Sequence, residues 1–426
     1  MAIDNKDKKV LKSSIEREQN EVACSAECEK IKGSKNLNVP HLRFPEFSGE
    51  WEMVSLQDIA TINPKSDPLQ NTFIYIDLEA VEKGELRKIQ EIMREEAPSR
   101  AQRVIDNNDI LFQCVRPYQK NNYIHRILNT SNQQWVASTG YAQIRTTELP
   151  NYIYHLLNTD EFNRKVMVRC TGSSYPAINS EDLATIHLYY TPDKKEQLKI
   201  SRLLDLLDKR IATQNKIIEK LQSLIKGLVD ELMTVLLKGK LYPFSSFYIK
   251  AGEGGTPTTS VVEYYTEGTI PFIKIEDLSC KYLTNNKDFI TELGMQKSSA
   301  WLIPSKSVIY SNGATIGAIS INEYPVCTKQ GILGIVPNTN INVEYLYLLM
   351  SSSYFSKEIS RIITEGTMKT AYLKDINHIK CPLPSMAQQK NITNLTSSIE
   401  EKLSIEQELL RFLNLQKQYL LHMIFI

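Results

Sequence analysis

The chain has 426 residues, of which 42% are hydrophobic and 23% are charged, and its formal net charge at pH 7 is +1. A chain of this length can form two or three domains, each with its own hydrophobic core. The balanced charge provides no overall attraction to nucleic acid, so any DNA-binding surface must be local. No apolar run approaches the roughly 20 residues that span a membrane, and the N-terminus is charged, so we expect a cytoplasmic protein without a membrane partner.

Residues 1–38 form an N-terminal extension with about equal numbers of acidic and basic residues and little hydrophobic periodicity. Two interpretations stay open: a disordered tail, or an extra helix that packs against the second helical region. Cys24 and Cys28 are the only two of the seven cysteines close enough in sequence to share a ligand, and no further pair completes a zinc set. We therefore predict reduced thiols and no metal site.

From residue 39 onward the two halves of the sequence are similar to each other, and matching residues lie about 192 to 199 positions apart. "FIYIDL" at Phe73 matches "FIKIEDL" at Phe272, and "NYIYHLLNTDEF" at Asn151 matches "VEYLYLLMSSSYF" at Val343. Chance matches would not stay collinear over such a length, so the chain is an internal duplication.

Each half begins with β-branched and aromatic runs broken by Gly, Pro and Asn, which predict short strands and turns. Helical patterns follow at about 151–168 and 343–361. We expect an α+β protein with two similar domains of mixed α/β structure, each followed by a long helix. The predicted domains are 39–190 and 239–384, and the predicted helical spacers are 191–238 and 385–426.

Both spacers carry a hydrophobic seam whose residues alternate at three- and four-residue steps, which is the heptad spacing of a coiled coil. The first seam includes Ile200, Leu204, Leu207, Ile211, Ile218 and Leu221, and the second includes Ile392, Ile399, Leu403, Leu410, Leu413 and Leu420. Polar Gln214 in the first seam falls opposite Glu406 in the second, where a polar pair can fix the register.

The ends of the spacers carry helix-start signals. Thr191 and Pro192 resemble a hydroxyl cap followed by Pro at the first helical position, and Ser385 with Gln388 forms a capping-box pattern. Each helix could simply cover its own domain. However, a helix of about 40 residues spans about 60 Å, which exceeds a domain of about 150 residues. We therefore predict that the two helices pair as an antiparallel coiled coil with pseudo-two-fold symmetry.

The passage just before each spacer is also repeated. "RCTGSSYPAINSEDLATIHL" begins at Arg169 and "ITEGTMKTAYLKDINHIKCP" begins at Ile363, and Gly172 matches Gly366. Elsewhere the halves diverge: one has "CVRPYQKNNY" where the other has "SNGATIGAIS". Duplex DNA has local two-fold symmetry, so two unlike domains on one spacer indicate an asymmetric, bipartite DNA target with an unread gap.

Candidate DNA contacts were sought in stretches that contain cations without neighbouring carboxylates, such as 110–147 and 162–180. Arginine can address guanine, asparagine can address adenine, and lysines, hydroxyls and tight glycine turns suit phosphate. The candidates are Arg116, Tyr118, Lys120, Arg169, Ser173, Ser174, Tyr175, Asn312, Lys329, Thr367 and Lys369. Simpler explanations stay open for several: a surface ion pair for Arg116, an ordinary Asn-Gly turn for Asn312, and a plain loop after Gly172.

The sequence shows no motif for catalysis. It has no Asn-Pro-Pro-aromatic methylation motif, no Gly-rich loop for a methyl donor and no Gly-x-x-x-x-Gly-Lys-Ser/Thr loop for ATP, and its six histidines are isolated. We therefore predict no catalytic residue and no cofactor bound by this chain.

Over residues 39–426 the chain resembles the specificity subunit of type I restriction-modification enzymes. The stretches that carry the resemblance are "VPHLRFPEFSGEWEMVSLQDIA" at Val39, "RPY" at Arg116, "SNGATIG" at Ser311, "KQGILGIVP" at Lys329 and the "PLP" helix entry at Pro382. The resemblance implies a non-catalytic subunit with two target-recognition domains that bind double-stranded DNA. It also implies two modification subunits around the helices, and restriction subunits that complete the nuclease.

The same resemblance assigns S-adenosylmethionine, ATP and magnesium to the partner subunits, which would methylate adenine within a split sequence. Two alternatives stay open: a coiled-coil scaffold that does not select DNA, and the DNA-recognition module of another restriction-methylation system. The scaffold explains the helices but leaves the two divergent domains without a role.

Overall fold

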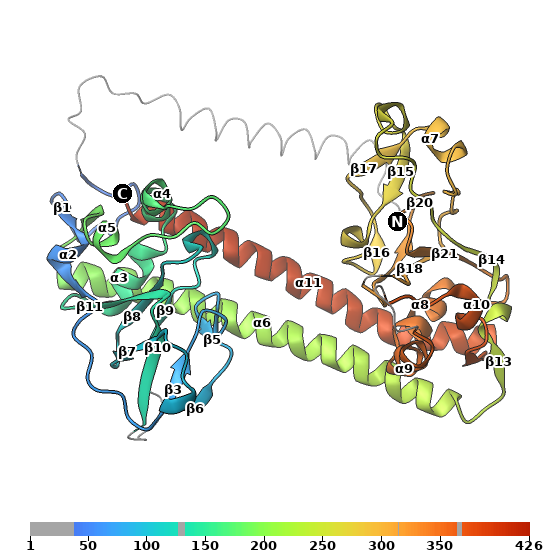
Figure 1. Ribbon diagram of the computed structural model, residues 1–426, viewed down its shortest axis with the longest axis horizontal. Coiled ribbons are helices and arrows are strands. Elements are labelled where there is room, and N and C mark those ends of the chain that lie inside the picture. Colours follow the sequence, from blue (N-terminus) through green and yellow to red (C-terminus); the bar gives the residue numbers. More distant parts are fainter. Residues whose placement is uncertain (1–37, 127–132, 314, 364–368) are drawn as a thin grey trace, which may run out of the picture. The chain divides into compact units, whose positions relative to one another are not determined.

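We describe a computed structural model over residues 38–126, 133–313, 315–363 and 369–426. Residues 1–37 of the predicted extension lie outside this range, as do Gly366 and Thr367. The chain divides into two compact units: unit 1 runs to Arg210 and includes Leu413–Ile426, and unit 2 is Ile211–Phe412. Each unit therefore combines one domain with part of both long helices (Figure 1).

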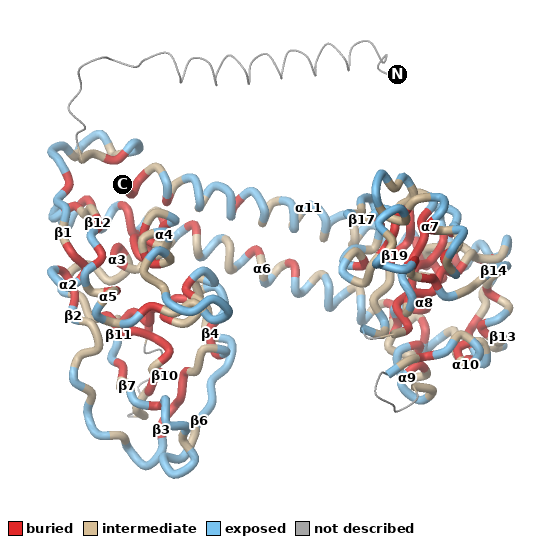
Figure 2. The backbone as a smooth tube through the Cα atoms, turned by 45° about the horizontal axis from the view of Figure 1, so that its top comes forward, coloured by how far each residue is buried: buried red, intermediate tan, exposed pale blue. Residues whose placement is uncertain are grey.

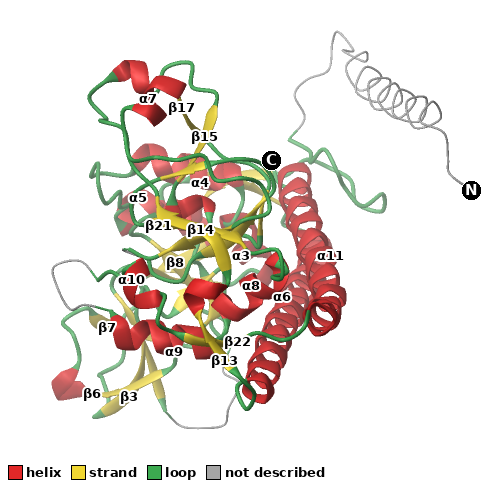
Figure 3. Ribbon diagram, turned by 90° about the vertical axis from the view of Figure 1, so that its right-hand side faces the viewer, coloured by secondary structure: helices red, strands yellow, loops and turns green. Residues whose placement is uncertain are grey.

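The domain of unit 1 is built from short strands joined by long loops, as the frequent Gly, Pro and Asn predict (Figure 3). One sheet has the order β2-β11-β8-β9, another β6-β3-β10-β7, and β1 pairs with β12. The strands of these sheets are β1 (Glu52–Ser55), β2 (Ala60–Ile62), β3 (Thr72–Ile76), β6 (Gln90–Met93), β7 (Ala101–Ile105), β8 (Ile110–Gln113), β9 (Tyr123–Ile124), β10 (Gln134–Ser138), β11 (Tyr141–Thr146) and β12 (His187–Tyr190).

The domain of unit 2 repeats this plan. Its sheets have the orders β14-β21-β18-β19-β16 and β17-β15-β20, and β13 pairs with β22. The strands are β13 (Leu241–Pro243), β14 (Tyr248–Glu253), β15 (Ile270–Ile273), β16 (Tyr282–Leu283), β17 (Asp288–Ile290), β18 (Val308–Ser311), β19 (Ile319–Asn322), β20 (Cys327–Thr328), β21 (Ile332–Pro337) and β22 (Lys380–Pro382). The parallel pair of β3 with β10 in unit 1 matches that of β15 with β20 in unit 2, and unit 2 has a second parallel pair, β16 with β19. The duplication predicted from the sequence is confirmed.

A pair of helices packs on the sheets of each domain. In unit 1 these are α3 (Pro150–Leu157) and α4 (Asp160–Arg169), and in unit 2 they are α8 (Val343–Ser351) and α9 (Ser353–Ile362). The start of the second helix is capped in the same way in both units. The Thr159 hydroxyl accepts the Phe162 N–H at 3.2 Å, and the Ser352 hydroxyl accepts the Phe355 N–H at 3.2 Å. Both phenylalanines are buried in their domain cores, so the cap and the core residue recur together.

Two long helices follow the domains, α6 (Lys194–Leu236) and α11 (Met386–Ile424). The predicted capping box at the start of α11 is confirmed, because the Gln388 N–H donates to the Ser385 hydroxyl and the Ser385 N–H donates to the Gln388 side chain. The predicted cap of α6 is wrong. Its first turn is capped by Asp193, whose carboxylate accepts the Lys195 N–H at 2.8 Å.

The two long helices pair within each unit. In unit 1, Ile200 and Leu204 of α6 share a core with Leu421 and Ile424 of α11. Farther along, the Lys417 ammonium pairs with Asp208 at 2.5 Å. Rising residue numbers along α6 therefore meet falling numbers along α11, and the helices are antiparallel.

The same direction holds in unit 2. The Gln214 amide donates to the Glu406 carbonyl at 3.0 Å and also to the Glu406 carboxylate, and Met233 shares a core with Ile392. The predicted antiparallel pairing and the predicted polar pair are both confirmed. Figure 2 shows buried and exposed residues alternating along both helices, as a one-sided seam requires.

Candidate nucleic-acid interface

Three loops of unit 1 meet at one place, which we call loop cluster 1. They are residues 114–120 after β8, residues 138–140 between β10 and β11, and residues 170–178 after α4. The Cys114 N–H donates to the Gly140 carbonyl at 3.0 Å, which joins the first loop to the second. The first loop is joined to the third by further backbone hydrogen bonds, so loops distant in sequence form one surface.

The third loop of cluster 1 is a tight turn held by its own backbone. Thr171 and Ala177 exchange both of their backbone hydrogen bonds at 2.9 Å. Gly172 has a φ of +90°, which L side chains rarely adopt, and a Cβ at this position would lie 2.9 Å from the Tyr175 carbonyl oxygen. The turn therefore requires glycine, and it presents exposed Ser173 to solvent.

The cluster brings together most of the residues predicted for the first half. The Arg116 N–H donates to the Pro176 carbonyl at 2.8 Å, and the Arg116 guanidinium lies over the Tyr175 ring, 4.5 Å from its centroid. Tyr175 is 63% exposed, Tyr118 is 51% exposed, and Ser174 is also exposed. This surface therefore offers two exposed aromatic rings and a serine hydroxyl for contact with a ligand.

Two predicted residues of the first half are bound within the protein instead. The Lys120 ammonium pairs with Asp160 at 2.5 Å and donates to the Asn158 carbonyl at 3.2 Å. The Arg169 guanidinium donates to the Asp182 carbonyl at 2.7 Å and to the Thr185 hydroxyl at 2.8 Å. Both side chains serve local structure, and we leave them out of the proposed contact surface.

An acid-free stretch of sequence does not predict unpaired cations, because folding brings carboxylates from other parts of the chain next to them. Arg145 lies in one of these stretches, yet it pairs with Asp109 at 2.8 Å and Asp106 at 2.5 Å. Arg164 pairs with Glu161, which directly precedes the second stretch. Distance along the chain therefore does not reveal which cations are neutralised.

Unit 2 builds the equivalent surface, loop cluster 2, from residues 312–313, 315–317, 328–331 and 369–372. The Asn312 N–H donates to the Gly331 carbonyl at 3.0 Å, as Cys114 does to Gly140 in unit 1. The Asn312 carbonyl accepts the Ala371 N–H at 2.9 Å, as the Cys114 carbonyl accepts the Ile178 N–H at 3.1 Å. The backbone frame of the two clusters is therefore the same.

The predicted role of Asn312 is wrong in its geometry. Its side chain is only 1% exposed, and its amide nitrogen donates to the Ala371 carbonyl at 3.1 Å. The amide thus joins two loops rather than facing a base. Lys329 and Lys369 are exposed, and within the described parts of the chain neither has an ion-pair partner. The remaining candidate, Thr367, lies outside the described residues.

The sequence pointed to Lys329 but not to the short turn at the centre of each cluster, residues 138–140 and 328–331, nor to the central position of these turns. The available signal was the glycine at the end of each turn. Gly331 has a φ of +84°, and a Cβ on Gly313 would lie 3.3 Å from the Gly331 Cα. The two loops approach so closely that only glycine fits.

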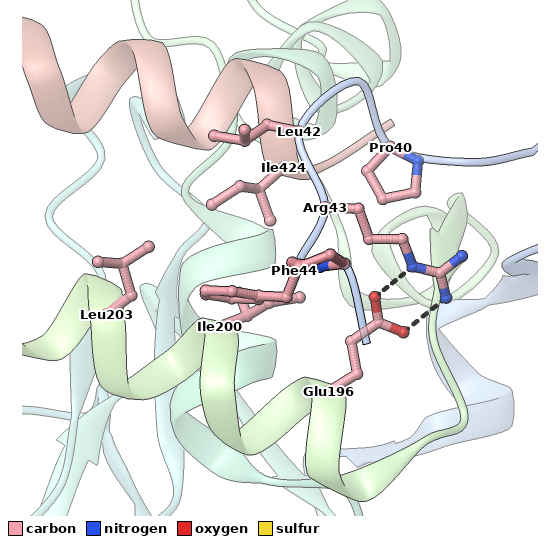
Figure 4. Close-up of a pocket in the computed structure, with 9 residues that line it drawn as sticks. Pro40, Leu42, Arg43, Phe44, Glu196, Ile200, Leu203 and Ile424 are labelled. Carbon is pink, nitrogen blue, oxygen red and sulfur yellow. Dashed lines mark hydrogen bonds and ion pairs between the residues drawn. The ribbon is translucent and has the colours of Figure 1, made fainter. Parts of the chain in front are cut away.

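A separate apolar pocket of about 130 Å³ lies in unit 1 where the segment after residue 38 crosses the start of α6 and the end of α11 (Figure 4). Its floor holds a bidentate ion pair, in which Arg43 donates to the two Glu196 carboxylate oxygens at 2.7 and 2.8 Å. Glu196 also accepts the Thr191 hydroxyl at 2.7 Å. The pocket shares no residue with loop cluster 1, and the ion pair fastens the N-terminal segment to the helices.

Within the described residues, no group of three or more His, Cys, Asp or Glu side chains is arranged to hold a metal ion. The cysteines in those parts of the chain, among them Cys114 and Cys381, are free thiols. None of the described helices is both long and apolar enough to cross a membrane.

The family model described as the type I restriction modification DNA specificity domain matches residues 48–223 and, a second time, residues 247–414. The chain belongs to this family. The HindI specificity subunit of Haemophilus influenzae is 22% identical over 400 residues, covering 75% of this chain and 83% of the relative. The MjaIX specificity subunit of Methanocaldococcus jannaschii is 30% identical over 154 residues, covering 35% of each chain.

Solved structures show the same fold. The type I restriction-modification S subunit from M. genitalium has a TM-score of 0.53 at 17% identity and covers 91% of this chain and 99% of its own. A chain from a study of complex assembly in the type I R-M system has a TM-score of 0.55 at 20% identity, covering 87% and 96%. As a type I specificity subunit, the chain recognises DNA sequence and is not itself an enzyme.

Proposed function

We propose that loop clusters 1 and 2 each contact one half of an asymmetric, bipartite DNA target. The observation that carries this proposal is a shared backbone frame that presents different side chains. Cluster 1 exposes Tyr118 and Tyr175, with the half-buried Arg116 over the Tyr175 ring, whereas cluster 2 exposes Lys329, Lys369 and Tyr372. The shared loop backbone lets both clusters dock on the DNA backbone of their half-sites in the same way. The different side chains let each cluster read a different base sequence.

The paired helices are the proposed spacer that sets the unread gap between the half-sites. The helices also offer apolar surface for partners, because some large side chains are exposed along them. These include Leu198, Leu206 and Leu224 of α6, and Leu395, Ile405 and Phe412 of α11. We assign this surface to two modification subunits, with restriction subunits joining the complex.

S-adenosylmethionine, ATP and magnesium are assigned in this proposal to the partner subunits, which act in the cytoplasm where the DNA lies. The division of labour has a direct biochemical consequence. The chain selects the DNA sequence, and the partner supplies the methyl-transfer chemistry.

A methylation assay tests this division. The full chain, its modification subunit, and the two together are incubated with a duplex library and labelled S-adenosylmethionine. Methylation only in the combined sample, at one recurring sequence, supports the proposal. Methylation by the chain alone would show that the chain is an enzyme. If the modification subunit methylates DNA without sequence preference whether or not the chain is present, the chain is a scaffold that does not select DNA.

A further inference from the structure

We propose that Gln330, at the tip of the central turn of loop cluster 2, recognises an adenine through its major-groove edge. This inference rests on the proposed function and specifies one base contact within it. The Gln330 side chain is exposed, and within the described residues its amide has no hydrogen-bond partner. An unpaired amide on a DNA-facing turn is free to bind a base.

The backbone of this turn is held on two sides. Glu253 at the end of β14 accepts the Gly331 N–H at 2.7 Å, and the Thr256 hydroxyl accepts the Gln330 N–H at 3.4 Å. On the other side, the Gly331 carbonyl accepts the N–H groups of Asn312 and Gly313 at 3.0 and 3.2 Å. A side chain on a clamped backbone loses less conformational freedom when it binds, so its hydrogen bonds discriminate better.

The loop that holds this turn is also closely packed, so side chains larger than glycine do not fit at two of its positions. A Cβ on Gly254 would lie 2.1 Å from the Thr328 carbonyl oxygen, and a Cβ on Gly255 would lie 2.2 Å from the Ser299 hydroxyl. Loop 253–256 therefore lies directly against the turn. Only the side chains of Lys329 and Gln330 are exposed at this tip.

The chemistry of the two tip residues differs. A glutamine amide carries both a donor and an acceptor, which match N7 and the N6 amino group of adenine in the major groove. A lysine ammonium is a donor only and suits phosphate or guanine. The base-specific contact with adenine therefore belongs to Gln330, and Lys329 supplies charge beside it.

The same turn in unit 1 cannot make this contact. Gly140, whose carbonyl accepts the Cys114 N–H, occupies the place of Gly331, so the residue before it is Thr139. Ser138 is buried and its hydroxyl accepts the Gly140 N–H at 3.2 Å, so it closes the turn upon itself. No long amide projects there, and the proposed adenine contact is specific to unit 2.

The test is selection from a random duplex library by the full chain with its modification subunit. Wild type, Gln330→Ala and Gln330→Glu are compared with Gln296→Ala, which removes an exposed glutamine from the same domain at the end of α7 (Glu292–Gln296). Preference for adenine at one position of one half-site should fall about 10- to 100-fold in Gln330→Ala. Gln330→Glu should shift preference at that position toward cytosine, because a carboxylate accepts from the cytosine N4 amino group.

The outcomes separate this inference from the proposed function. If the wild type selects a split motif and Gln330→Ala selects the same motif with equal stringency, the adenine contact is refuted while the proposed function stands. If the wild type selects no motif, both are refuted. An unchanged motif with Gln296→Ala, together with a loss confined to one position with Gln330→Ala, supports the contact.

Discussion

His125 and Asn322 occupy the same place in the two domains but differ in chemistry. His125 directly follows β9, and Asn322 is the last residue of β19. These two strands have equivalent partners, because β9 pairs with β8 through Ile124 and Ile110, and β19 pairs with β18 through Ile321 and Val308. Both side chains are 0% exposed. Asn322 donates to two carbonyl oxygens at 2.8 Å and accepts a backbone N–H at 2.8 Å. His125, by contrast, packs at a tilted angle against the Trp135 ring, and neither of its ring nitrogens has a hydrogen-bond partner in the described structure.

The attachment of each domain to its helices differs in a similar way. In unit 2, Lys281 lies between Glu344 of α8 and Glu400 of α11, 2.6 Å from each carboxylate. In unit 1, Asp208 takes the position of Glu400 in the repeat and pairs with Lys417 of the neighbouring helix instead. The duplication has therefore kept the places where contacts form and changed the groups that form them. Each unit should respond differently to mutation and to pH.

The largest effect is expected from Lys281→Met in unit 2. The substitution leaves two carboxylates facing one another with little solvent, at a cost of about 3 kcal/mol. Urea unfolding should show this loss, and hydrogen exchange should place it in peptides of unit 2. Lys306→Met is the control, because the Lys306–Glu323 pair is exposed and should contribute less than about 0.5 kcal/mol. Equal losses in both variants would show that Lys281 is not an anchor.

A somewhat smaller effect concerns acid sensitivity in unit 1. Burial lowers the pKa of His125 to about 4, although nearby Asp109 opposes this shift. Between pH 6.5 and 4 the unfolded chain binds a proton that the folded chain does not, so the free energy of unfolding falls by about 2.5 kcal/mol as the pH drops through this range. His125→Leu should remove this dependence in urea unfolding followed across that range. The exposed His378→Gln should retain it, and identical profiles for all three proteins would contradict the prediction.

The turn at Gly172 allows a sharper test of loop cluster 1. Gly172→Ala forces both an unfavourable φ and a contact with the Tyr175 carbonyl oxygen, and should cost about 1–2 kcal/mol. Gly49 has nearly the same φ, +89°, but nothing lies within 4 Å of a Cβ placed there. Gly49→Ala should therefore lower stability slightly without weakening DNA binding, as measured by fluorescence anisotropy. If the two variants bind DNA with equal affinity, the turn at Gly172 is not part of the DNA-binding surface.

The smallest effect is expected from two candidate contact cations, the half-buried Arg116 and the exposed Lys369. Arg116→Ala should relax base preference in one half-site by about tenfold, since arginine discriminates guanine through two hydrogen bonds. Lys369→Ala should instead weaken binding to all sequences alike and reduce the salt dependence by about one unit. Binding titrations at several salt concentrations on matched and scrambled duplexes distinguish the two. The same pattern for both variants would contradict the assigned difference between the clusters.

The sequence predicted the features that depend on local periodicity. The heptad steps located the helix seam, and Gln214 does meet Glu406 because both residues interrupt that seam. Features that depend on the folded surface were less accessible. The burial of Asn312 and the pairing of Arg145 with Asp109 arise from segments far away in the chain, so no local pattern reveals them. The cap of α6 lies at Asp193 and not at Thr191, because the helix begins at Lys194 and the Thr191 hydroxyl accepts the Asp193 N–H, which precedes the helix.

The same limit applies to the candidate interface. Gly172 and Tyr175 were found through the repeated passage, since repetition marks the position of a loop even when its partners are unknown. In the turn at 328–331 only Lys329 was predicted. Gln330 was missed because the central position of the turn comes from contacts with residues 253–256 and 312–313, which are distant in sequence.

The most direct test is the shape of the DNA motif that the intact chain selects with its modification subunit from a random duplex library. Two domains held by one spacer predict two unlike blocks of specified bases separated by a gap of fixed length and random sequence. A single continuous block, or two blocks at freely variable separation, would contradict the proposal that the helices hold two recognition surfaces apart.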